Sequence, residues 1–309
     1  MSSAPRHGTV GATQRRRERA GADSGSSAVV LRMQAGNGRR PFRLAPALLL
    51  IWLFALVLAL VGLGGLPLRD WDEGIVARVA LEASQAPWPD KLLPTYWGSS
   101  YLNKPPGLHL LIAAVISGWR HVSQAPARAI PPDWVVRLAP ALLSALLPPL
   151  LALVQFRLRP GERAPALATA ALALTLMPLV RHGRLAMLDG GLLVAMVLQW
   201  WAVIGLGRGP AAFWLGGLAG LATSAVLLLK APAALPLLLA ALLLRRLDPE
   251  RTPARWLPFL MALALGLLPG AGWHLLHWSV RGPEALAMWG SQGFARVAGS
   301  VEEIGRAHV

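Results

Sequence analysis

Two acidic residues stand side by side in the first polar stretch that follows a long apolar one. They are Asp72 and Glu73, within residues 68–74. A carboxylate in such a position can act as a general base on an acceptor hydroxyl or amine. The pair can equally begin a helix, with Asp72 as the N-cap and Glu73 favoured by the helix dipole. The residue types alone leave both interpretations open.

A lysine followed by two prolines comes next, in Asn103-Lys104-Pro105-Pro106. The prolines restrict the backbone and place Lys104 at the head of an apolar segment. There its ammonium group can neutralise a phosphate as a point charge. A lysine that buries its stem and extends its head group to water at a membrane surface has the same sequence pattern.

Further charged residues stand where apolar stretches meet. Arg181, Arg184 and Asp189 lie between two such stretches, and Lys230 ends a later one. Ionisable groups at such junctions are costly unless they are paired or functional. They therefore predict either a polar site or, more simply, an Arg–Asp pair that closes a loop and a lysine that reaches the membrane surface.

The composition indicates which elements must position these residues. The chain has 309 residues, of which 55% are hydrophobic and only 15% charged, with a mean hydropathy of +0.49. Soluble proteins average about 45–50% apolar and about 25% charged residues. Helices satisfy their backbone groups within one segment, as lipid requires. We therefore expect an all-α membrane protein. The absence of cysteine excludes disulfides and thiolate metal sites.

Seven apolar blocks predict membrane-spanning helices. A further block, Pro106–Trp119, is too short to span and predicts an interfacial or re-entrant segment. Residues 73–84 have helical periodicity and are expected to lie along the membrane surface. The seven blocks are Leu44–Leu66, Val135–Phe156, Ala164–Val180, Gly190–Gly207, Ala211–Leu229, Ala231–Leu244 and Trp256–Val280.

The basic residues predict the orientation. Residues 1–43 are rich in Ser, Gly and Arg, and we expect a disordered cytoplasmic tail rather than a nucleic-acid-binding arm, because no aromatic residue precedes Phe42. If Pro106–Trp119 does not cross, eight loop arginines fall on the side of the tail and six basic residues on the other. A transmembrane domain over 44–280, an extracytoplasmic loop over about 67–134 and an extracytoplasmic tail over 281–309 follow.

A metal site is not predicted. His274 and His277 lie one helical turn apart, but no third ligand is near them in sequence, and an interfacial aromatic belt explains them better. No ligand set near Asp72 requires a metal ion, although a divalent cation there stays an open alternative.

In chain order these pieces resemble the glycosyltransferase family 39 superfamily, which includes protein O-mannosyltransferases and 4-amino-4-deoxy-L-arabinose lipid A transferases. The resemblance runs from about Pro41 to Pro283. The matching pieces are Asp72-Glu73, Asn103-Lys104-Pro105-Pro106, Arg137-Leu138-Ala139-Pro140, Arg184 to Asp189 and Lys230-Ala231-Pro232.

The resemblance implies a GT-C fold and a bacterial inner-membrane enzyme that transfers a hexose or pentose. The donor would be a polyprenyl-phosphate sugar, the acceptor a lipid or protein on the outer face, and the reaction one inverting displacement. The implied catalytic residues are Asp72 with Glu73 beside it. The implied substrate-binding residues are Lys104 on the carrier phosphate, Arg184, Asp189, Lys230 and Asn103.

Some features depart from the family pattern. Asn103 stands where many relatives have Glu, and Ala231 where they often have Gly. Relatives are longer, so we expect a C-terminally truncated member. A non-catalytic remnant is therefore one alternative. A multi-pass transporter is another, although the internal repeats that it predicts are not seen.

Overall fold

The computed structural model describes residues 44–69, 71–248 and 254–290. The chain divides into two units, Met1–Leu44 and Ala45–Val309. Of the first unit only Leu44 is described, so the expected basic tail lies outside the described residues, as do residues 291–309 of the expected C-terminal tail. The second unit contains all the other elements.

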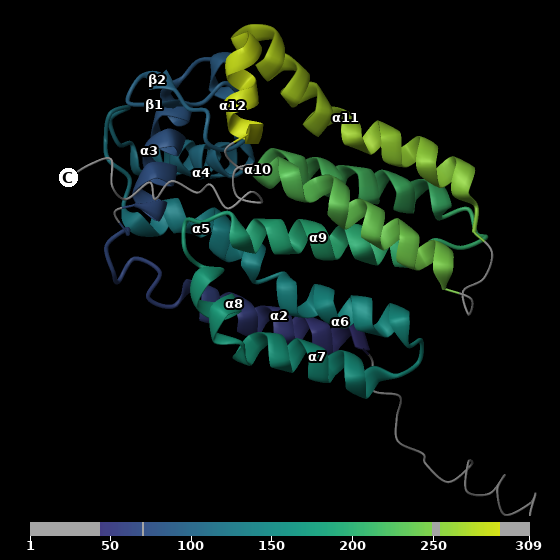
Figure 1. The fold of residues 1–309 in the computed structure, drawn as a ribbon. Coiled ribbons are helices and arrows are strands. Elements are labelled where there is room, and N and C mark those ends of the chain that lie inside the picture. The colour runs from purple at the N-terminus through teal and green to yellow at the C-terminus, as the bar shows by residue number, and fades with distance from the viewer. Residues whose placement is uncertain (1–43, 70, 249–253, 291–309) are drawn as a thin grey trace, which may run out of the picture. The chain divides into compact units, whose positions relative to one another are not determined.

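Helices make up most of the described chain (Figure 1), as predicted from the composition. A short hairpin of two antiparallel strands, each two residues long, was not predicted from the sequence. It pairs Thr95 with Ser100 and Tyr96 with Ser99. The elements are α2 Leu44–Leu60, α3 Asp72–Gln85, η1 Asp90–Leu92, β1 Thr95–Tyr96, β2 Ser99–Ser100, α4 Gly107–Ser123, α5 Asp133–Ser144, α6 Leu147–Leu158, α7 Arg163–Thr175, α8 Met177–His182, α9 Asp189–Ile204, α10 Ala212–Leu247, α11 Trp256–Arg281, η2 Gly282–Glu284 and α12 Ala285–Trp289.

Three described stretches are long and apolar enough to cross a membrane, judged by length and composition. They are Asp133–Leu158, Ala212–Leu247 and Trp256–Met288, while α2 and α9 are shorter apolar helices. Many leucines on these helices are exposed, for example Leu50 and Leu235. Exposed apolar side chains on long helices are what a lipid environment requires, so the membrane assignment is confirmed.

Prolines divide two of the predicted helices. The expected helix Val135–Phe156 is two helices, α5 and α6, and Pro148 lies in the first turn of α6. The expected helix Ala164–Val180 is interrupted at Leu176, whose backbone is extended at φ −71° and ψ 102°. Proline has no backbone N–H, so it fits the first turn of a helix well and weakens or kinks a helix when it lies in the interior. A single helix over Ala164–Val180 was therefore a wrong prediction, whereas Asp133–Leu158 still forms one apolar stretch long enough to cross a membrane.

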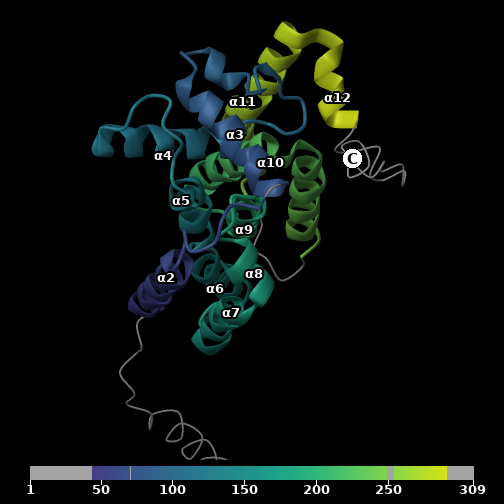
Figure 2. The ribbon, with the colours of Figure 1, turned by 90° about the vertical axis from the view of Figure 1, so that its left-hand side faces the viewer.

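Lys230 interrupts α10. Its backbone is non-helical, at φ −153° and ψ 80°, and Pro232 follows. Ala219 before the kink packs in one cluster with Leu238 and Ala241 after it. The two halves of α10 therefore run back along each other, as Figures 1 and 2 show. The prediction of two apolar helices that meet at Lys230 is confirmed.

Small residues let α10 approach α11 closely. A Cβ added at Gly220 would lie only 2.3 Å from the carbonyl oxygen of Leu263. A Cβ at Gly216 would lie 2.1 Å from the carbonyl oxygen of Phe259. Glycine is common at such contacts between membrane helices because it lets the backbones touch.

Helix α4 lies across the end of the long helices rather than along them. Figure 1 views the long helices from the side, and Figure 2 views them end-on, where α4 extends sideways. Its buried residues Leu108, Ile112 and Ile116 pack in one cluster with Val76 of α3 and Val135 of α5. This placement agrees with the expectation that residues 106–119 do not run with the spanning helices.

Candidate functional site

A pocket with a volume of about 220 Å³ lies where the start of α3, the start of α9 and the kink of α10 meet. These elements come together at one end of the long helices, on the left in Figure 1. Four residues singled out from the sequence line it, namely Asp72, Lys104, Asp189 and Lys230. Apolar side chains, among them Leu192, supply the rest of its wall. We call this the aspartate–lysine pocket.

Asp72 reaches the pocket from the first turn of α3. Trp71 occupies the N-cap position, no side chain caps the helix, and Asp72 is the first helical residue. The alternative in which Asp72 serves as the N-cap is therefore wrong. Its carboxylate is exposed at the pocket wall.

Glu73 points the other way, into the protein. One carboxylate oxygen accepts hydrogen bonds from Arg137 Nε at 2.8 Å and from the backbone N–H of Ala186 at 2.7 Å. The other accepts from Arg137 Nη2 at 2.7 Å and from the backbone N–H of Arg69 at 3.2 Å. Glu73 is fully buried and does not line the pocket. A catalytic role in contact with substrate therefore does not fit its geometry.

The contacts of Glu73 favour its ionised form. Burial raises the pKa of a carboxyl group, but the hydrogen bonds from Arg137, Ala186 and Arg69 outweigh it, and the pKa of Glu73 is lowered. The carboxylate is consequently ionised at neutral pH, and its contacts join α3, α5 and the segment before α9.

Arg137 has a structural role that was not predicted from the sequence. It is only 4% exposed and donates three further hydrogen bonds, to the carbonyls of Leu63 at 3.1 Å, Leu66 at 2.7 Å and Pro67 at 2.9 Å. The sequence feature that could have indicated this role is the position of Arg137 inside the apolar block Val135–Phe156, because an unpaired charge there is costly.

The Lys-Pro-Pro-Gly sequence places Lys104 at the pocket. Gly107 begins α4, and a Cβ there would lie 2.6 Å from the carbonyl oxygen of Leu228. Helix α4 can therefore start directly against α10, two residues before Lys230. This close approach brings Lys104 and Lys230, far apart in sequence, to one pocket.

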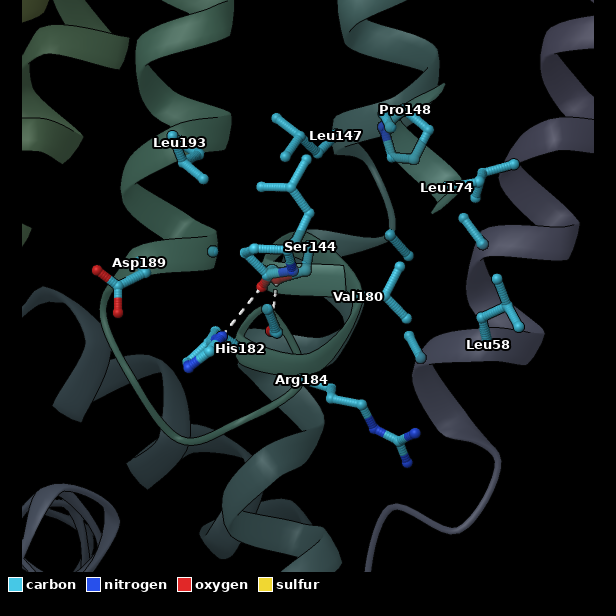
Figure 3. Close-up of a pocket in the computed structure, with 18 residues that line it drawn as sticks. Leu58, Ser144, Leu147, Pro148, Leu174, Val180, His182, Arg184, Asp189 and Leu193 are labelled. Atoms are coloured by element: carbon cyan, nitrogen blue, oxygen red, sulfur yellow. Dashed lines mark hydrogen bonds between the residues drawn. The ribbon is translucent and has the colours of Figure 1, made fainter. Parts of the chain in front are cut away.

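Arg184 and Asp189 do not form the expected loop-closing pair. Figure 3 shows Arg184 extending toward α2, while Asp189 extends to the opposite side. The Arg184 guanidinium donates to the carbonyl of Val61. Asp189 begins α9 and lines the aspartate–lysine pocket, which neither Arg184 nor Asn103 lines.

The described residues contain no group of three or more His, Asp or Glu side chains that could hold a metal ion. His277 stacks on Trp273, with ring centroids 4.8 Å apart, and a nitrogen of His274 lies 3.2 Å from the carbonyl oxygen of Leu227.

The pocket combines cations, carboxylates and apolar walls. Lysine ammonium groups stabilise phosphate oxygens, and most strongly where negative charge grows during a reaction. A carboxylate in the same pocket can take a proton from a nucleophile. The arrangement suits displacement of a phosphate leaving group from a partly apolar molecule.

Comparisons with known proteins identify the family and the fold. The family model described as dolichyl-phosphate-mannose-protein mannosyltransferase matches residues 102–269, more than half of the chain. The crystal structure of ArnT from Cupriavidus metallidurans bound to undecaprenyl phosphate is similar, with a TM-score of 0.61 and 21% identity. The similarity confirms the expected GT-C membrane fold. It covers 80% of this chain but only 44% of ArnT. No curated protein sequence matches.

Proposed function

We propose that this chain, which belongs to the dolichyl-phosphate-mannose-protein mannosyltransferase family, transfers a sugar from a polyprenyl-phosphate carrier to a lipid or protein acceptor. The observation that carries the proposal is the aspartate–lysine pocket, where Asp72, Lys104, Asp189 and Lys230 meet. The similar protein ArnT binds undecaprenyl phosphate, which supports a lipid phosphate as the carrier.

In the proposed reaction Asp72 is the general base. An acceptor hydroxyl or amine attacks the anomeric carbon and forms the new glycosidic bond, while the bond from that carbon to the phosphate oxygen breaks. The proton of the acceptor goes to the Asp72 carboxylate, and the electron pair leaves with the phosphate. A single displacement inverts the anomeric configuration.

Lys104 and Lys230 stabilise the leaving group. Negative charge on the phosphate oxygen grows as the bond breaks, so fixed ammonium groups lower the energy of the transition state. In this proposal Asp189, which lines the same pocket, accepts hydrogen bonds from the hydroxyl groups of the sugar. Glu73, Arg184 and Asn103 stay outside the reacting groups, because none of them lines the pocket.

The cellular setting forms part of the proposal. The carrier is a membrane lipid, and we place the protein in a bacterial inner membrane with the aspartate–lysine pocket facing the periplasm. The apolar side chains in the pocket wall, such as Val76 and Leu229, are suited to the first units of a prenyl chain.

The test is sugar transfer in membranes that contain the chain and are supplied with polyprenyl-phosphate sugars. Asp72→Asn keeps the size of the side chain but removes the base. Loss of general-base catalysis typically slows a reaction by about 10²–10⁴-fold, and we expect such a loss here. Asp90→Asn, which changes an exposed aspartate outside the pocket, is expected to leave the rate unchanged.

Full transfer by Asp72→Asn would refute the role of Asp72 as the base. A wild-type chain that inserts normally but transfers no sugar, under conditions in which a longer relative is active with the same donors, would support the non-catalytic alternative.

A further inference from the structure

A second pocket, of about 470 Å³, is lined by four arginines, namely Arg69, Arg137, Arg181 and Arg184. No acidic residue is among its described lining residues, although the neighbouring Asp70 lies outside the described part of the chain. We call it the arginine pocket. Arg137 is neutralised by Glu73, but the three other arginines form no ion pair among the described residues.

The described side chains around the arginine pocket therefore carry a net positive charge. Arg69 and Arg181 are exposed, and Arg184 is half-buried. Arginine binds phosphate through a planar fork of N–H donors, often with two parallel hydrogen bonds. Three such groups around one pocket are complementary to a phosphate anion.

An apolar pocket adjoins the arginine pocket and is drawn in Figure 3. Its volume is about 60 Å³, and its wall consists mainly of aliphatic side chains from α2, α6, α7, α8 and α9, including Leu58, Leu147 and Leu174. Asp189 contributes the one carboxylate among the described lining residues. Arg184 lines both pockets. In Figure 3 its side chain extends away from the aliphatic side chains, toward the end of α2. Positively charged side chains therefore lie at one end of the narrow apolar pocket.

We infer that the two pockets together bind an anionic phospholipid of the bilayer, with its phosphate in the arginine pocket and part of an acyl chain in the apolar pocket. A soluble phosphate would occupy only the arginine pocket. Helices α2, α6 and α7 carry the apolar pocket and belong to the predicted spanning blocks, so a bilayer lipid can enter it sideways. Clusters of basic residues at the membrane surface attract anionic lipid head groups.

The arginine pocket is separate from the aspartate–lysine pocket, because these two pockets have no lining residue in common. The apolar pocket touches the aspartate–lysine pocket only through Asp189, which lines both. The segment before α9 lies between the arginine pocket and the aspartate–lysine pocket, with Arg184 and Leu185 on one side and Met187 and Leu188 on the other. A phosphate at the arginines is therefore not the leaving group opposite Asp72. This is the reason to assign a lipid of the bilayer rather than the sugar carrier, and the inference does not depend on the proposed activity.

The test uses the full chain, purified in a neutral detergent and delipidated, with lipid binding followed by native mass spectrometry and by the melting temperature. The probes are phosphatidylglycerol, phosphatidylcholine, glycerol 1-phosphate and undecaprenyl phosphate. We expect phosphatidylglycerol to bind and to raise the melting temperature, and phosphatidylcholine and glycerol phosphate to do neither.

Two variants and one matched control locate the site. Arg69→Gln combined with Arg181→Gln removes two exposed charges and is expected to weaken phosphatidylglycerol binding about tenfold or more. Leu58→Phe narrows the apolar pocket without a change in charge and is expected to weaken it as well. Arg128→Gln, an exposed arginine in the loop between α4 and α5, is expected to have no effect.

Several results would overturn the inference. If phosphatidylcholine bound as well as phosphatidylglycerol, the charge of the head group would not be recognised. If glycerol 1-phosphate bound as well as phosphatidylglycerol, the apolar pocket would play no part. Unchanged phosphatidylglycerol binding in the double arginine variant would place the lipid elsewhere. Parallel loss of undecaprenyl phosphate binding in that variant would assign the arginines to the donor site. Retained undecaprenyl phosphate binding supports two separate sites and also shows that the variant is folded.

Discussion

At the scale of single residues, two neighbouring acidic side chains make different contacts. Asp72 and Glu73 follow each other in the first turn of α3, so their side chains project about 100° apart around the helix. Asp72 reaches the aspartate–lysine pocket, while Glu73 reaches Arg137 inside the protein. We interpret Glu73 as the residue that holds the wall of the pocket in place, because it also binds the backbone of Ala186, three residues before Asp189.

The buried pair between Glu73 and Arg137 predicts a large loss of stability in Glu73→Gln. Removing one partner of a buried ion pair typically costs about 3–5 kcal/mol, because the other charge stays buried without a counterion. Glu162→Gln is the matched control, since its pair with Arg159 is 3.7 Å long and exposed, and exposed pairs contribute about 0–1 kcal/mol. The measurement is the free energy of unfolding of the two variants in detergent. Equal losses would contradict the structural role of Glu73.

The same pair has a predicted pH dependence. The pKa of Glu73 in the folded protein lies below its ordinary value of 4.5. The stabilisation is then complete above that ordinary value and is lost as the pH falls through the lowered folded-state pKa. Between neutral pH and the ordinary value, Glu73 should therefore add no pH dependence to the melting temperature.

At the scale of elements, the position of α4 decides whether the pocket exists. The helix lies across the end of the long helices, and its first residue touches the carbonyl of Leu228 just before the kink of α10. The loop before α4 is also held by its neighbours. Glu82 of α3 accepts hydrogen bonds from the hydroxyl of Thr95 at 2.6 Å and the backbone N–H of Trp97 at 2.8 Å. The hairpin is thereby joined to α3.

Gly107→Ala tests this contact, with Gly118→Ala in the same helix as the matched control. A Cβ at Gly107 would lie 2.6 Å from a backbone oxygen of α10, whereas one at Gly118 would meet no atom within 4 Å. We expect Gly107→Ala to lower the melting temperature and to weaken polyprenyl-phosphate binding, because α4 and Lys104 must move. Gly118→Ala should stabilise α4 slightly, by about 0.5–1 kcal/mol, through the better helix propensity of alanine. Equal effects of both variants would show that the close approach is not required.

At the scale of the whole molecule, the predicted topology puts the aspartate–lysine pocket and the hairpin on one side of the membrane and the loop between α9 and α10 on the other. The pocket is lined by the starts of α3 and α9 and the kink of α10, which lie at one end of the long helices (Figure 1). Residues 205–211 connect α9 to α10 at the other end.

Cysteine labelling can check this orientation, because the native chain contains no cysteine. Ser100→Cys places a thiol in the exposed hairpin, and Gly209→Cys places one in the exposed α9–α10 loop. We expect a membrane-impermeant maleimide to label Ser100→Cys in spheroplasts and Gly209→Cys only after the membrane is opened. The reverse pattern would invert the topology, and labelling of both in spheroplasts would contradict a crossing between them.

Much of this architecture could be predicted from local properties of the sequence. Long apolar blocks predicted the helices, because a backbone in lipid must bond within its own segment. The charged Lys230 between the apolar blocks Ala211–Leu229 and Ala231–Leu244 marked the place where α10 is interrupted. The short block at 106–119 indicated that α4 differs from the spanning helices. The ordered motifs also named four residues that line one pocket, Asp72, Lys104, Asp189 and Lys230.

Only the tertiary structure decided how the charged side chains are divided among partners. Sequence spacing does not show which side of α3 faces the core, so it could not separate Asp72 from Glu73. Arg137 and Arg184 depend on contacts with residues more than sixty positions away in the sequence. The partners of Arg137 are Glu73 and the carbonyls of residues 63–67, and the partner of Arg184 is the carbonyl of Val61. Such partners are set by how the helices pack. The arginine pocket exists only because that packing brings Arg69, Arg181 and Arg184 together.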